Sequence, residues 1–308
     1  MIETVELTTE PVGRSVSVAL SSKTGKVVVC VLVFFWTIPT FGLLVSSVRP
    51  EKEVKTTGWW TAFLRPKFTL SNYSKVWNSA AGSGDGLGHY FLNSFKIAIP
   101  STVIPISIAA LAAYAFSWMR FKGRDWLYIG VICLLAVPLQ MALIPVLQLN
   151  THGAHIGSIP IIPALGLQDS IVLVWMAHTF FGMPFAIFIL RNFISALPSE
   201  LIEAARVDGA GHLTVFRKLV LPLSIPAIAS LAIFQFMWVW NDLLIGRLFG
   251  GSKNLPIIGK LVELAGTRGQ DWHLLTAGAF VAMAVPLVVF FSLQRFFVRG
   301  LLAGAVKG

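Results

Sequence analysis

The sequence predicts an all-α, polytopic membrane protein with six transmembrane helices. Hydrophobic residues make up 56% of the 308 residues and charged residues only 12%, whereas soluble globular chains carry roughly 25% charged residues. The apolar residues also gather in runs that approach or exceed the ~20 residues needed to cross a ~30 Å hydrocarbon core. Backbone polar groups find no partners in lipid, so each run is expected to form a helix.

The predicted transmembrane permease domain covers residues 27–298, between a cytoplasmic N-terminal tail (1–26) and a cytoplasmic C-terminal tail (299–308). The N-terminal tail is polar, and the apolar run after it, about 22 residues, is longer than the 7–15 of a signal peptide, so it is expected to remain as a membrane anchor. A long external loop is expected at 49–89. The six spans are expected at about 27–48, 90–119, 126–149, 171–190, 221–245 and 274–293.

Two features within the spans bear on their packing. Prolines recur inside them and can kink a helix; such kinks can widen a transport cavity, but membrane helices also tolerate proline generally, and both interpretations stay open. Alanines between Ala109 and Ala115 allow another helix to approach the second span closely. The prolines concerned are Pro39, Pro100, Pro105, Pro138, Pro145, Pro184, Pro226 and Pro286.

The short loops predict the orientation. Arg120, Lys122 and Arg124 lie between spans two and three, whereas residues 150–170 contain no Lys or Arg. Basic short loops stay in the cytoplasm, so the first loop is expected inside and the second outside. Alternation then places both termini and the segment between spans four and five in the cytoplasm. The longer outer loops, with six basic residues in 49–89 and four in 246–273, weaken this bias without reversing it.

Charge and cysteine content exclude two other classes. The net charge of +10 comes from Lys and Arg residues spread among the loops, not from the basic stripe of a nucleic-acid-binding protein. Cys30 and Cys133 both fall in apolar runs and match no disulfide or metal spacing. Both are expected to be small buried hydrophobic residues.

The segment between spans four and five, residues 197–220, is polar and is called the bracket below. Pro198 and Ser199 can begin a helix, with Ser199 as its cap. Glu200 and Glu203 follow, near the positive end of the helix dipole. Ala204 and Ala205 add a small surface.

Asp208-Gly209 is expected to end this first bracket helix, because glycine accepts the left-handed conformation found after helices. A second short helix is expected from Leu213 to Val220, and Pro222 begins span five. Such a bracket can dock a soluble partner. On physical grounds alone, an interfacial amphipathic loop without a partner remains an alternative.

The order of residues in the bracket resembles the cytoplasmic EAA signature of bacterial ABC importer permeases. Leucine at 219 replaces the more usual isoleucine. The wider form from Leu197 to Ala210, a Trp240-Asn241-Asp242 segment and the tail from Gly300 to Gly308 are similar to the carbohydrate branch, the maltose-type permeases. The resemblance covers roughly residues 27–308. The signature positions are Glu203, Ala204, Ala205, Gly209, Leu219, Leu221 and Pro222.

This resemblance implies a non-catalytic permease subunit that carries a carbohydrate, such as an oligosaccharide or α-glucoside, across a bacterial plasma membrane. The implied partners are a second homologous permease, two copies of an ABC ATPase, an external sugar-binding protein and the lipid bilayer. ATP and Mg would be used by the partner subunits, and this chain would bind no cofactor. Glu200, Glu203, Ala204, Ala205, Asp208, Gly209, Leu219 and Pro222 would then couple to the ATPase. Gly300, Gly304 and Lys307 would mark the C-terminal tail, which can reach the ATPase pair.

Other polar groups give weaker signals. The glycine-rich run from Gly82 to Gly88 lacks the Lys-Ser/Thr of a nucleotide-binding loop and is expected to be an external loop. His89, His152, His155 and His273 lie in outer loops without a supporting metal-ligand constellation, so no metal site is predicted.

Four residues of spans four and five are weak pathway or outer-loop candidates. His178 is either a bundle histidine with a hydrogen-bond partner or a pathway residue. Asp242 lies near the outer interface, where a structural partnership with the outer loop is the favoured interpretation. Trp240 and Asn241 complete the set.

Three alternatives remain. An ABC permease for another solute, such as a polyamine or phosphate, fits the tail and the bracket less well. An ion-coupled secondary transporter would need buried carboxylates in its spans, and only Asp242 offers one. A membrane-embedded enzyme would need a catalytic cluster that the sequence lacks.

Overall fold

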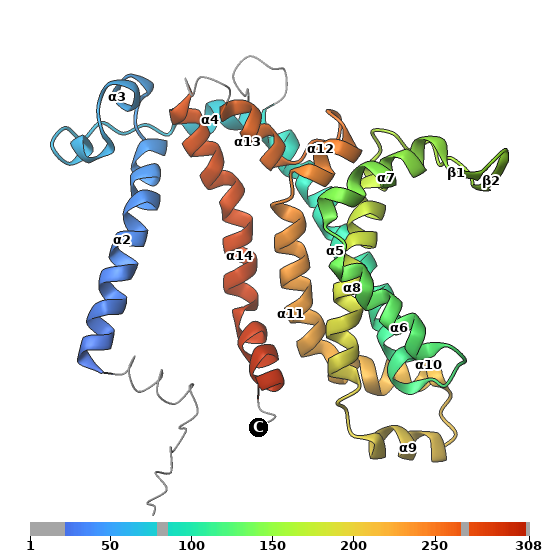
Figure 1. Cartoon of the computed structure of the whole chain (residues 1–308). Helices are drawn as coiled ribbons and strands as arrows, with labels where there is room; N and C mark the ends of the chain where they lie inside the picture. Colours follow the sequence, from blue (N-terminus) through green and yellow to red (C-terminus); the bar gives the residue numbers. More distant parts are fainter. Residues whose placement is uncertain (1–21, 79–85, 266–270, 306–308) are drawn as a thin grey trace, which may run out of the picture. The chain divides into compact units, whose positions relative to one another are not determined.

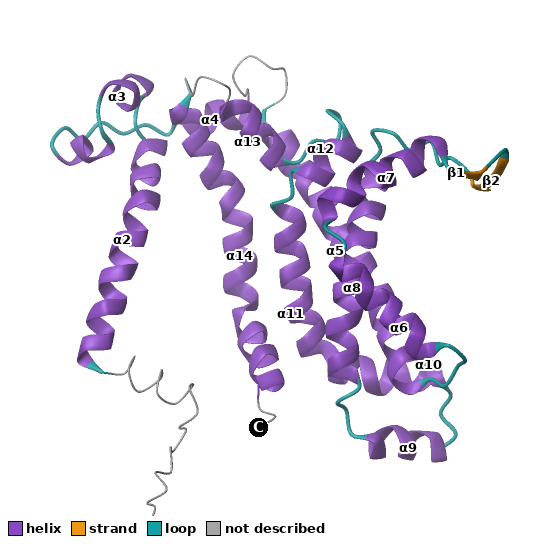
Figure 2. Ribbon diagram, viewed as in Figure 1, coloured by secondary structure: helices purple, strands orange, loops and turns teal. Residues whose placement is uncertain are grey.

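The computed structural model describes residues 22–78, 86–265 and 271–305, and for 293–305 the backbone alone. The chain forms two compact units. One contains Met1–Ser74 with Asp271–Ala277, and the other contains Lys75–Gln270 with Gly278–Gly308. The described elements are almost all helical, as the sequence predicts (Figure 2).

Helix α2 (Lys23–Ser47) dominates the first unit. Its apolar side chains face outward around most of its circumference, and among its residues only Gly42 and Ser47 are buried. A helix that is apolar on every side suits hydrocarbon rather than water. After it come α3 (Glu51–Thr56), the 3-10 turn η1 (Trp59–Phe63) and α4 (Ser71–Asn78).

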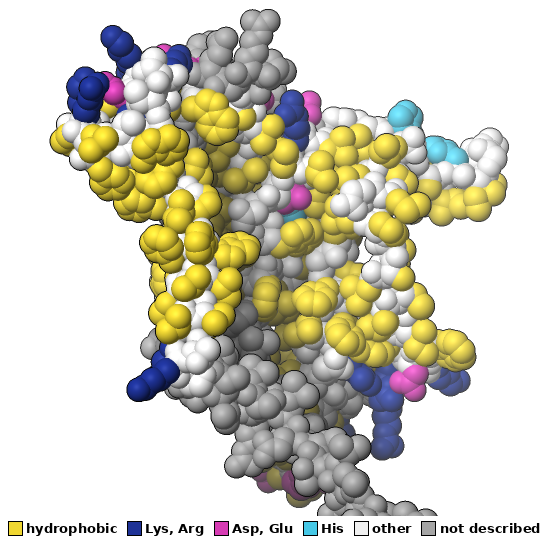
Figure 3. Space-filling model, turned by 60° about the vertical axis from the view of Figure 1, so that its left-hand side comes forward, with side chains coloured by type: hydrophobic (Ala, Val, Ile, Leu, Met, Phe, Trp, Pro, Cys, Tyr) yellow, Lys and Arg dark blue, Asp and Glu magenta, His cyan; other side chains and the backbone are white. Residues whose placement is uncertain are grey.

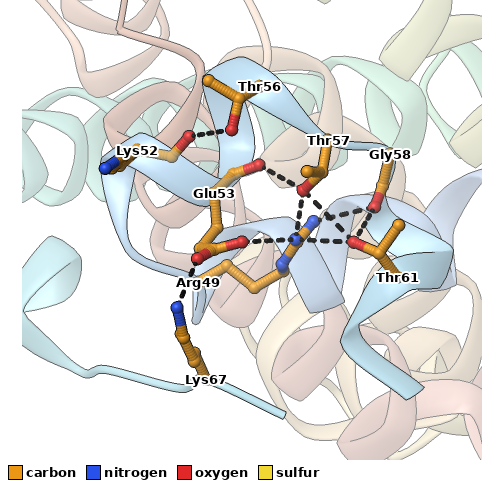
Figure 4. A network of polar contacts seen from close by, with 8 residues as sticks. All are labelled: Arg49, Lys52, Glu53, Thr56, Thr57, Gly58, Thr61 and Lys67. Carbon is orange, nitrogen blue, oxygen red and sulfur yellow. Dashed lines mark hydrogen bonds and ion pairs between the residues drawn. The ribbon is translucent and has the colours of Figure 1, made fainter. Parts of the chain in front are cut away.

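Arg49 organises the residues that follow α2. Its side chain is 2% exposed. It donates hydrogen bonds to Gly58 O at 3.0 Å and to the hydroxyls of Thr57 and Thr61 at 2.7 and 2.9 Å, and it lies 3.8 Å from the Glu53 carboxylate (Figure 4). A buried charge is tolerated only when it is paired and hydrogen-bonded, so this network holds α3 and η1 in one arrangement.

Glu53 continues that network toward the surface. Lys67 Nζ lies 2.9 Å from its second carboxylate oxygen. The hydrogen bond from Lys67 lowers the pKa of Glu53, and the positive charges of Lys67 and Arg49 act in the same direction. Glu53 therefore stays ionised beside Arg49.

The second unit is built around α5 (Leu87–Trp118), which packs against α8 (Ile171–Ile194) and α11 (Leu221–Trp240). The small face of α5, which includes buried Ala109, Ala110 and Ala113, gives the close approach that the sequence predicts.

Short helices α12 (Leu244–Gly250) and α13 (Ile257–Ala265) follow α11 and lie near the N-terminal end of α5 (Figure 1). The backbone amide of Ile257 donates to the Ser94 hydroxyl at 2.8 Å. This bond ties the start of α13 to α5.

The third predicted span differs from the straight helix expected over 126–149. It consists of α6 (Arg124–Cys133) with the 3-10 turn η2 (Leu134–Ala136), then α7 (Leu139–His152), and the two parts are bent by 108°. Pro138 lies at the break and has extended backbone angles. Proline also disfavours the helical conformation at the residue before it, which explains the break.

Other boundaries also differ from the predictions. Span five ends at Trp240, before a separate α12, and α14 (Trp272–Ala305) continues well past the predicted end of span six at 293. An antiparallel hairpin of β1 (Ala154–Ile156) and β2 (Ile159–Ile162) follows α7. In all, five described helices are long and apolar enough to cross a membrane, or six if the bent pair is one span.

The cysteine prediction was wrong. Cys30 and Cys133 are both exposed, because an apolar side chain on a membrane helix can face lipid instead of a protein core. The other prolines expected within spans lie inside continuous helices: Pro39, Pro100, Pro105, Pro145, Pro184, Pro226 and Pro286.

Trp240 should be a major source of stability in the second unit. It is 1% exposed, its ring centroid lies 5.0 Å from that of Phe95, and its indole N–H donates to Ala282 O at 3.1 Å. Trp240→Ala should destabilise the fold by about 3–5 kcal/mol, measured as a lower melting temperature in detergent. Trp126→Ala, at a residue 79% exposed, is the control and should change it little. Equal melting temperatures for the two variants would contradict this assignment.

Candidate functional site

The bracket forms two helical pieces joined by a glycine turn. Helix α9 (Ser199–Val207) runs across the end of the second unit, beyond the ends of α8 and α11 (Figure 1). Ser199 is the first helical residue and not the cap, since the cap position is Pro198 and no side chain bonds there. Gly209 has φ +79°, a conformation that is costly for residues with a Cβ. Its amide donates to Arg206 O at 3.0 Å, which closes the turn.

The sequence predicts a second bracket helix that is separate from span five. In the structure the two are continuous. The second piece comprises α10 (His212–Val215) and a π-helical turn (Phe216–Val220) that runs directly into α11. In this turn the amide of Leu221 donates to Phe216 O, five residues back. Pro222 follows at once, and its ring would crowd the carbonyl four residues earlier in an ordinary helix. The wider π turn accommodates it, so that α10 and α11 form one continuous rod.

Buried apolar side chains fix the bracket to the membrane helices. Ile202 of α9 and Val215 and Phe216 of the second piece belong to the same buried cluster as Leu190 and Ile194 of α8. A displacement of α9 would therefore disturb packing in the helix bundle, because close-packed interiors transmit strain.

Polar contacts add to this attachment. The Tyr114 hydroxyl of α5 lies 3.0 Å from His212 Nδ1. Arg206 donates to Trp118 O at 2.9 Å, and the Trp118 indole N–H donates to Ile194 O at 3.2 Å. The bracket is thus bonded directly to α5, and through Trp118 to α8.

The outward surface of the bracket carries most of the sequence-predicted coupling residues. Ala205 and Leu219 are half-buried, and Pro222 is exposed in the first turn of α11. Those that the structure leaves exposed on the bracket are Glu200, Glu203, Ala204, Asp208 and Gly209.

Sequence reasoning missed two residues of this surface. Val207 is 86% exposed and Leu213 65% exposed, although both lie on a polar element that the sequence places in water. Both side chains add apolar area to the exposed surface of the bracket. Their positions on either side of the glycine turn could have identified them in the sequence.

The weak candidates near the other end of α8 and α11 do come together. His178 is fully buried, its Nδ1 lies 2.9 Å from Val174 O, and its Nε2 lies 3.7 Å from Asp242 Oδ2. That same oxygen accepts the amides of Ile245 at 2.7 Å and Gly246 at 3.3 Å. Asp242 therefore holds the first turn of α12, which supports the structural interpretation of this residue.

Trp240 and Asn241, the other two weak candidates, make their contacts at the C-terminal end of α11. Trp240 is buried against Phe95 and Phe236. The Asn241 side chain donates to Met237 O on its own helix at 2.8 Å. Both contacts are those of residues that stabilise the end of α11.

A cavity of about 300 Å³ lies between α8 and α11. Aromatic rings dominate its wall, and the polar group is Gln235, which is 6% exposed. Gln235 donates to Ser101 O at 3.2 Å. Pro105, four residues further along α5, has no N–H for that carbonyl, so Gln235 supplies the missing donor. The lining residues besides Gln235 are Phe181, Gly182, Phe185, Leu231, Phe234 and Trp238.

The C-terminal tail can be placed only in part. Gly300 and Gly304 belong to the helical backbone of α14. Lys307 lies outside the described residues, as do residues 1–21 and most of the glycine-rich run that begins at Gly82.

Comparison with known families identifies the chain. The model of the family described as "Binding-protein-dependent transport system inner membrane component" matches residues 105–303, which include the bracket. The chain belongs to this family. It is accordingly a multi-pass protein of the inner membrane and a transport component, and the family that the bracket predicts is confirmed.

Two relatives align with most of the chain. It is 53% identical over 287 residues, 91% of each chain, to the "Osmoprotective compounds uptake permease protein GgtD" of Synechocystis sp.. It is 52% identical over 268 residues, 86% of this chain and 67% of the relative, to the "Alpha-glucoside transport system permease protein AglG" of Rhizobium meliloti.

A solved structure shares the fold. A chain of a bacterial alginate ABC transporter, in complex with an alginate pentasaccharide-bound periplasmic protein, aligns with a TM-score of 0.66 over 94% of this chain and 98% of its own. The two are 13% identical, so the similarity shows the architecture and not the substrate.

One group of possible metal ligands occurs among the described residues of the permease. Ligand atoms of Glu51, Asp271 and His273 lie within 4.8 Å of one another. Lys55 bonds to Glu51, and that bond, with the nearby negative charge of Asp271, raises the pKa of Lys55. His273 Nε2 also lies 3.6 Å from the other oxygen of the Glu51 carboxylate, so Glu51 contacts both Lys55 and His273.

Proposed function

We propose that this permease moves a carbohydrate, delivered by an external binding protein, into the cytoplasm, and that ATP hydrolysis on a separate ATPase drives the movement. The family supports a binding-protein-dependent system, and the names of GgtD and AglG support a glycoside or related solute. The proposed complex contains this chain, a second homologous permease and two ATPase copies. ATP and Mg act on the ATPase, and this chain binds neither.

The proposed topology has six spans, with α6 and α7 together forming the third, and both termini in the cytoplasm. Within the second unit, α9, α10, the basic turn at 119–123 and the C-terminal end of α14 lie at one end (Figure 1). The arrangement agrees with the basic residues Arg120 and Lys122 in that short turn and Arg124 at the start of α6. The hairpin and α12 then face the outside.

The observation that carries the proposal is the two-sided character of the bracket. Its outward side exposes Glu203, Ala204 and Val207, while its inward side buries Ile202 and Phe216 in the helix bundle. In our account α9 rests in a groove of the ATPase, and closure of the ATPase pair displaces it. The buried side passes that displacement to α5 and α8, which is how a ligand on one subunit biases a two-state element on another.

We propose the α8–α11 cavity as part of the sugar pathway. Its volume lies at the lower end of the ~300–1,000 Å³ range of small-molecule sites. Aromatic rings can stack on the apolar faces of a sugar, and the Gln235 amide can bond hydroxyls. The lining residues that the structure describes contain no charged side chain, which favours a neutral sugar or polyol over an anionic one.

Two alternatives are less well supported. An ABC permease for another solute, such as a polyamine or phosphate, fits the wider form of the bracket and the C-terminal tail less well. An ion-coupled transporter would rely on Asp242, whose carboxylate already bonds the amides that begin α12. Uptake driven by a proton gradient without ATP would favour that second alternative.

Gly209→Val tests the coupling role of the bracket. Valine at a positive φ is strained by on the order of 1–3 kcal/mol, so α9 should lose its position and ATP-dependent uptake in vesicles should fall by about tenfold or more. ATP hydrolysis should continue without transport. Gly211→Val is the matched control, because Gly211 has φ −72° and open space around its Cβ position. Normal uptake by Gly209→Val would contradict the proposed role.

Phe181→Ala tests the sugar pathway. Loss of one stacking ring should weaken sugar-stimulated ATPase activity and uptake by about tenfold, the equivalent of ~1.4 kcal/mol. Phe180→Ala removes an exposed ring next to it that does not line the cavity, and uptake should stay near the unmodified value. If both variants transport equally well, the cavity is not part of the pathway, while the coupling test above remains independent.

A further inference from the structure

The segment that follows α2 exposes an unusual amount of apolar surface. Among its larger hydrophobic residues, exposed fractions are 61% for Trp60, 67% for Phe63 and 83% for Leu64. Phe68 and Leu70 are 61% and 72% exposed. Grouped exposed side chains of this kind mark contact with another protein or with a membrane.

These side chains stand on a rigid support. Trp59 lies flat against α2 at Gly42, where an added Cβ would come within 2.7 Å of the Trp59 indole nitrogen. The Phe41 and Phe63 rings stack with centroids 6.3 Å apart, and Phe41 meets Trp59 edge-on at 6.0 Å. With the Arg49 network (Figure 4), these contacts fix η1 to the end of α2. The exposed side chains of η1 therefore stand on a segment that specific contacts hold against α2.

The exposed surface continues the lipid-facing surface of α2. Phe41, Leu43 and Leu44, in the last turns of α2, are each more than two-fifths exposed, and in a spanning helix such side chains contact lipid. Hydrophobic side chains run from α2 into the folded segment at its end, with Lys and Arg at the margin (Figure 3). Tryptophan beside basic residues at the end of a span is typical of the membrane–water interface.

The other side of the same segment is polar. Helix α3 carries Glu51, Lys52 and Lys55, all exposed. Arg65 is also exposed, next to Leu64. The segment thus has an apolar side joined to the hydrocarbon and a charged side for water, which is the arrangement of an interfacial anchor.

We propose that residues 59–70 form a membrane-interface anchor whose partner is phospholipid. Trp60, Phe63 and Leu64 enter the boundary between headgroups and acyl chains, and Arg65 lies at the level of the lipid phosphates, where basic residues are attracted to anionic lipid. The anchor sets the depth of α2 in the bilayer. This proposal does not depend on the transported solute or on which side of the membrane the segment lies.

Spin-label accessibility can test the anchor in the full-length permease. Cys30→Ser and Cys133→Ser remove the native thiols, and a nitroxide is then attached at Leu64→Cys in proteoliposomes of phosphatidylethanolamine and phosphatidylglycerol. Collision with oxygen, which concentrates in lipid, should exceed collision with a water-soluble nickel chelate several-fold. Lys52→Cys, on the charged side, is the matched control and should show the reverse preference.

Three results would overturn the proposal. A Leu64 label as accessible to nickel as the Lys52 label would place the surface in water. A Leu64 label reached by neither reagent would mean that protein, for example the second permease, covers it. Protection that appears only when the binding protein is added would make the surface a docking site for that protein.

Discussion

The coupling proposed for this permease depends on the buried contact between the bracket and the helix bundle. Ile202, Val215 and Phe216 share one apolar cluster with α8, and the Tyr114–His212 contact ties the same element to α5. Without this contact α9 would be a polar loop between two spans, and a force applied to it would be lost. With it, a displacement of α9 can reach the helices of the bundle.

The continuous rod of α10 and α11 extends this connection. The π-helical turn at Phe216–Val220 lets the chain pass Pro222 without a break. Residues of the cavity, such as Phe234 and Gln235, lie on the same helix as the bracket's second piece. A rotation that begins at Gly209 can therefore reach the cavity through one rigid element. The hydrogen bond from Gln235 to the Ser101 carbonyl then connects that element to α5.

Much of the fold could be predicted from the sequence, because the length and polarity of an apolar run determine whether it can lie in a bilayer. The approximate positions of the long apolar helices and the glycine turn at Gly209 follow from such local rules. The break at Pro138 did not follow, since seven other prolines lie inside continuous helices and only packing distinguishes them. The exposure of Cys30 could not be predicted either, because the sequence does not show whether an apolar residue of a membrane helix contacts lipid or the protein core.

In the site, too, some residues could be recognised from the sequence and others depended on packing. Glu203 and Gly209 could be recognised from their order in the chain, whereas the exposed Val207 and the cavity around Gln235 required the relative rotation of the helices. His178 and Asp242 are 64 positions apart in the sequence, and only the packing of α8 beside α12 brings them together.

The most direct measurement is a cross-link from α9 to the ATPase. Ala204→Cys, in a background without Cys30 and Cys133, would be treated with a bifunctional maleimide in membranes that contain the assembled transporter. We expect an adduct with the ATPase from Ala204→Cys, and none from Ala164→Cys, which is exposed in the loop after β2. An Ala204→Cys thiol that never reaches the ATPase, or that a membrane-impermeant reagent labels from outside the cell, would contradict the proposed coupling.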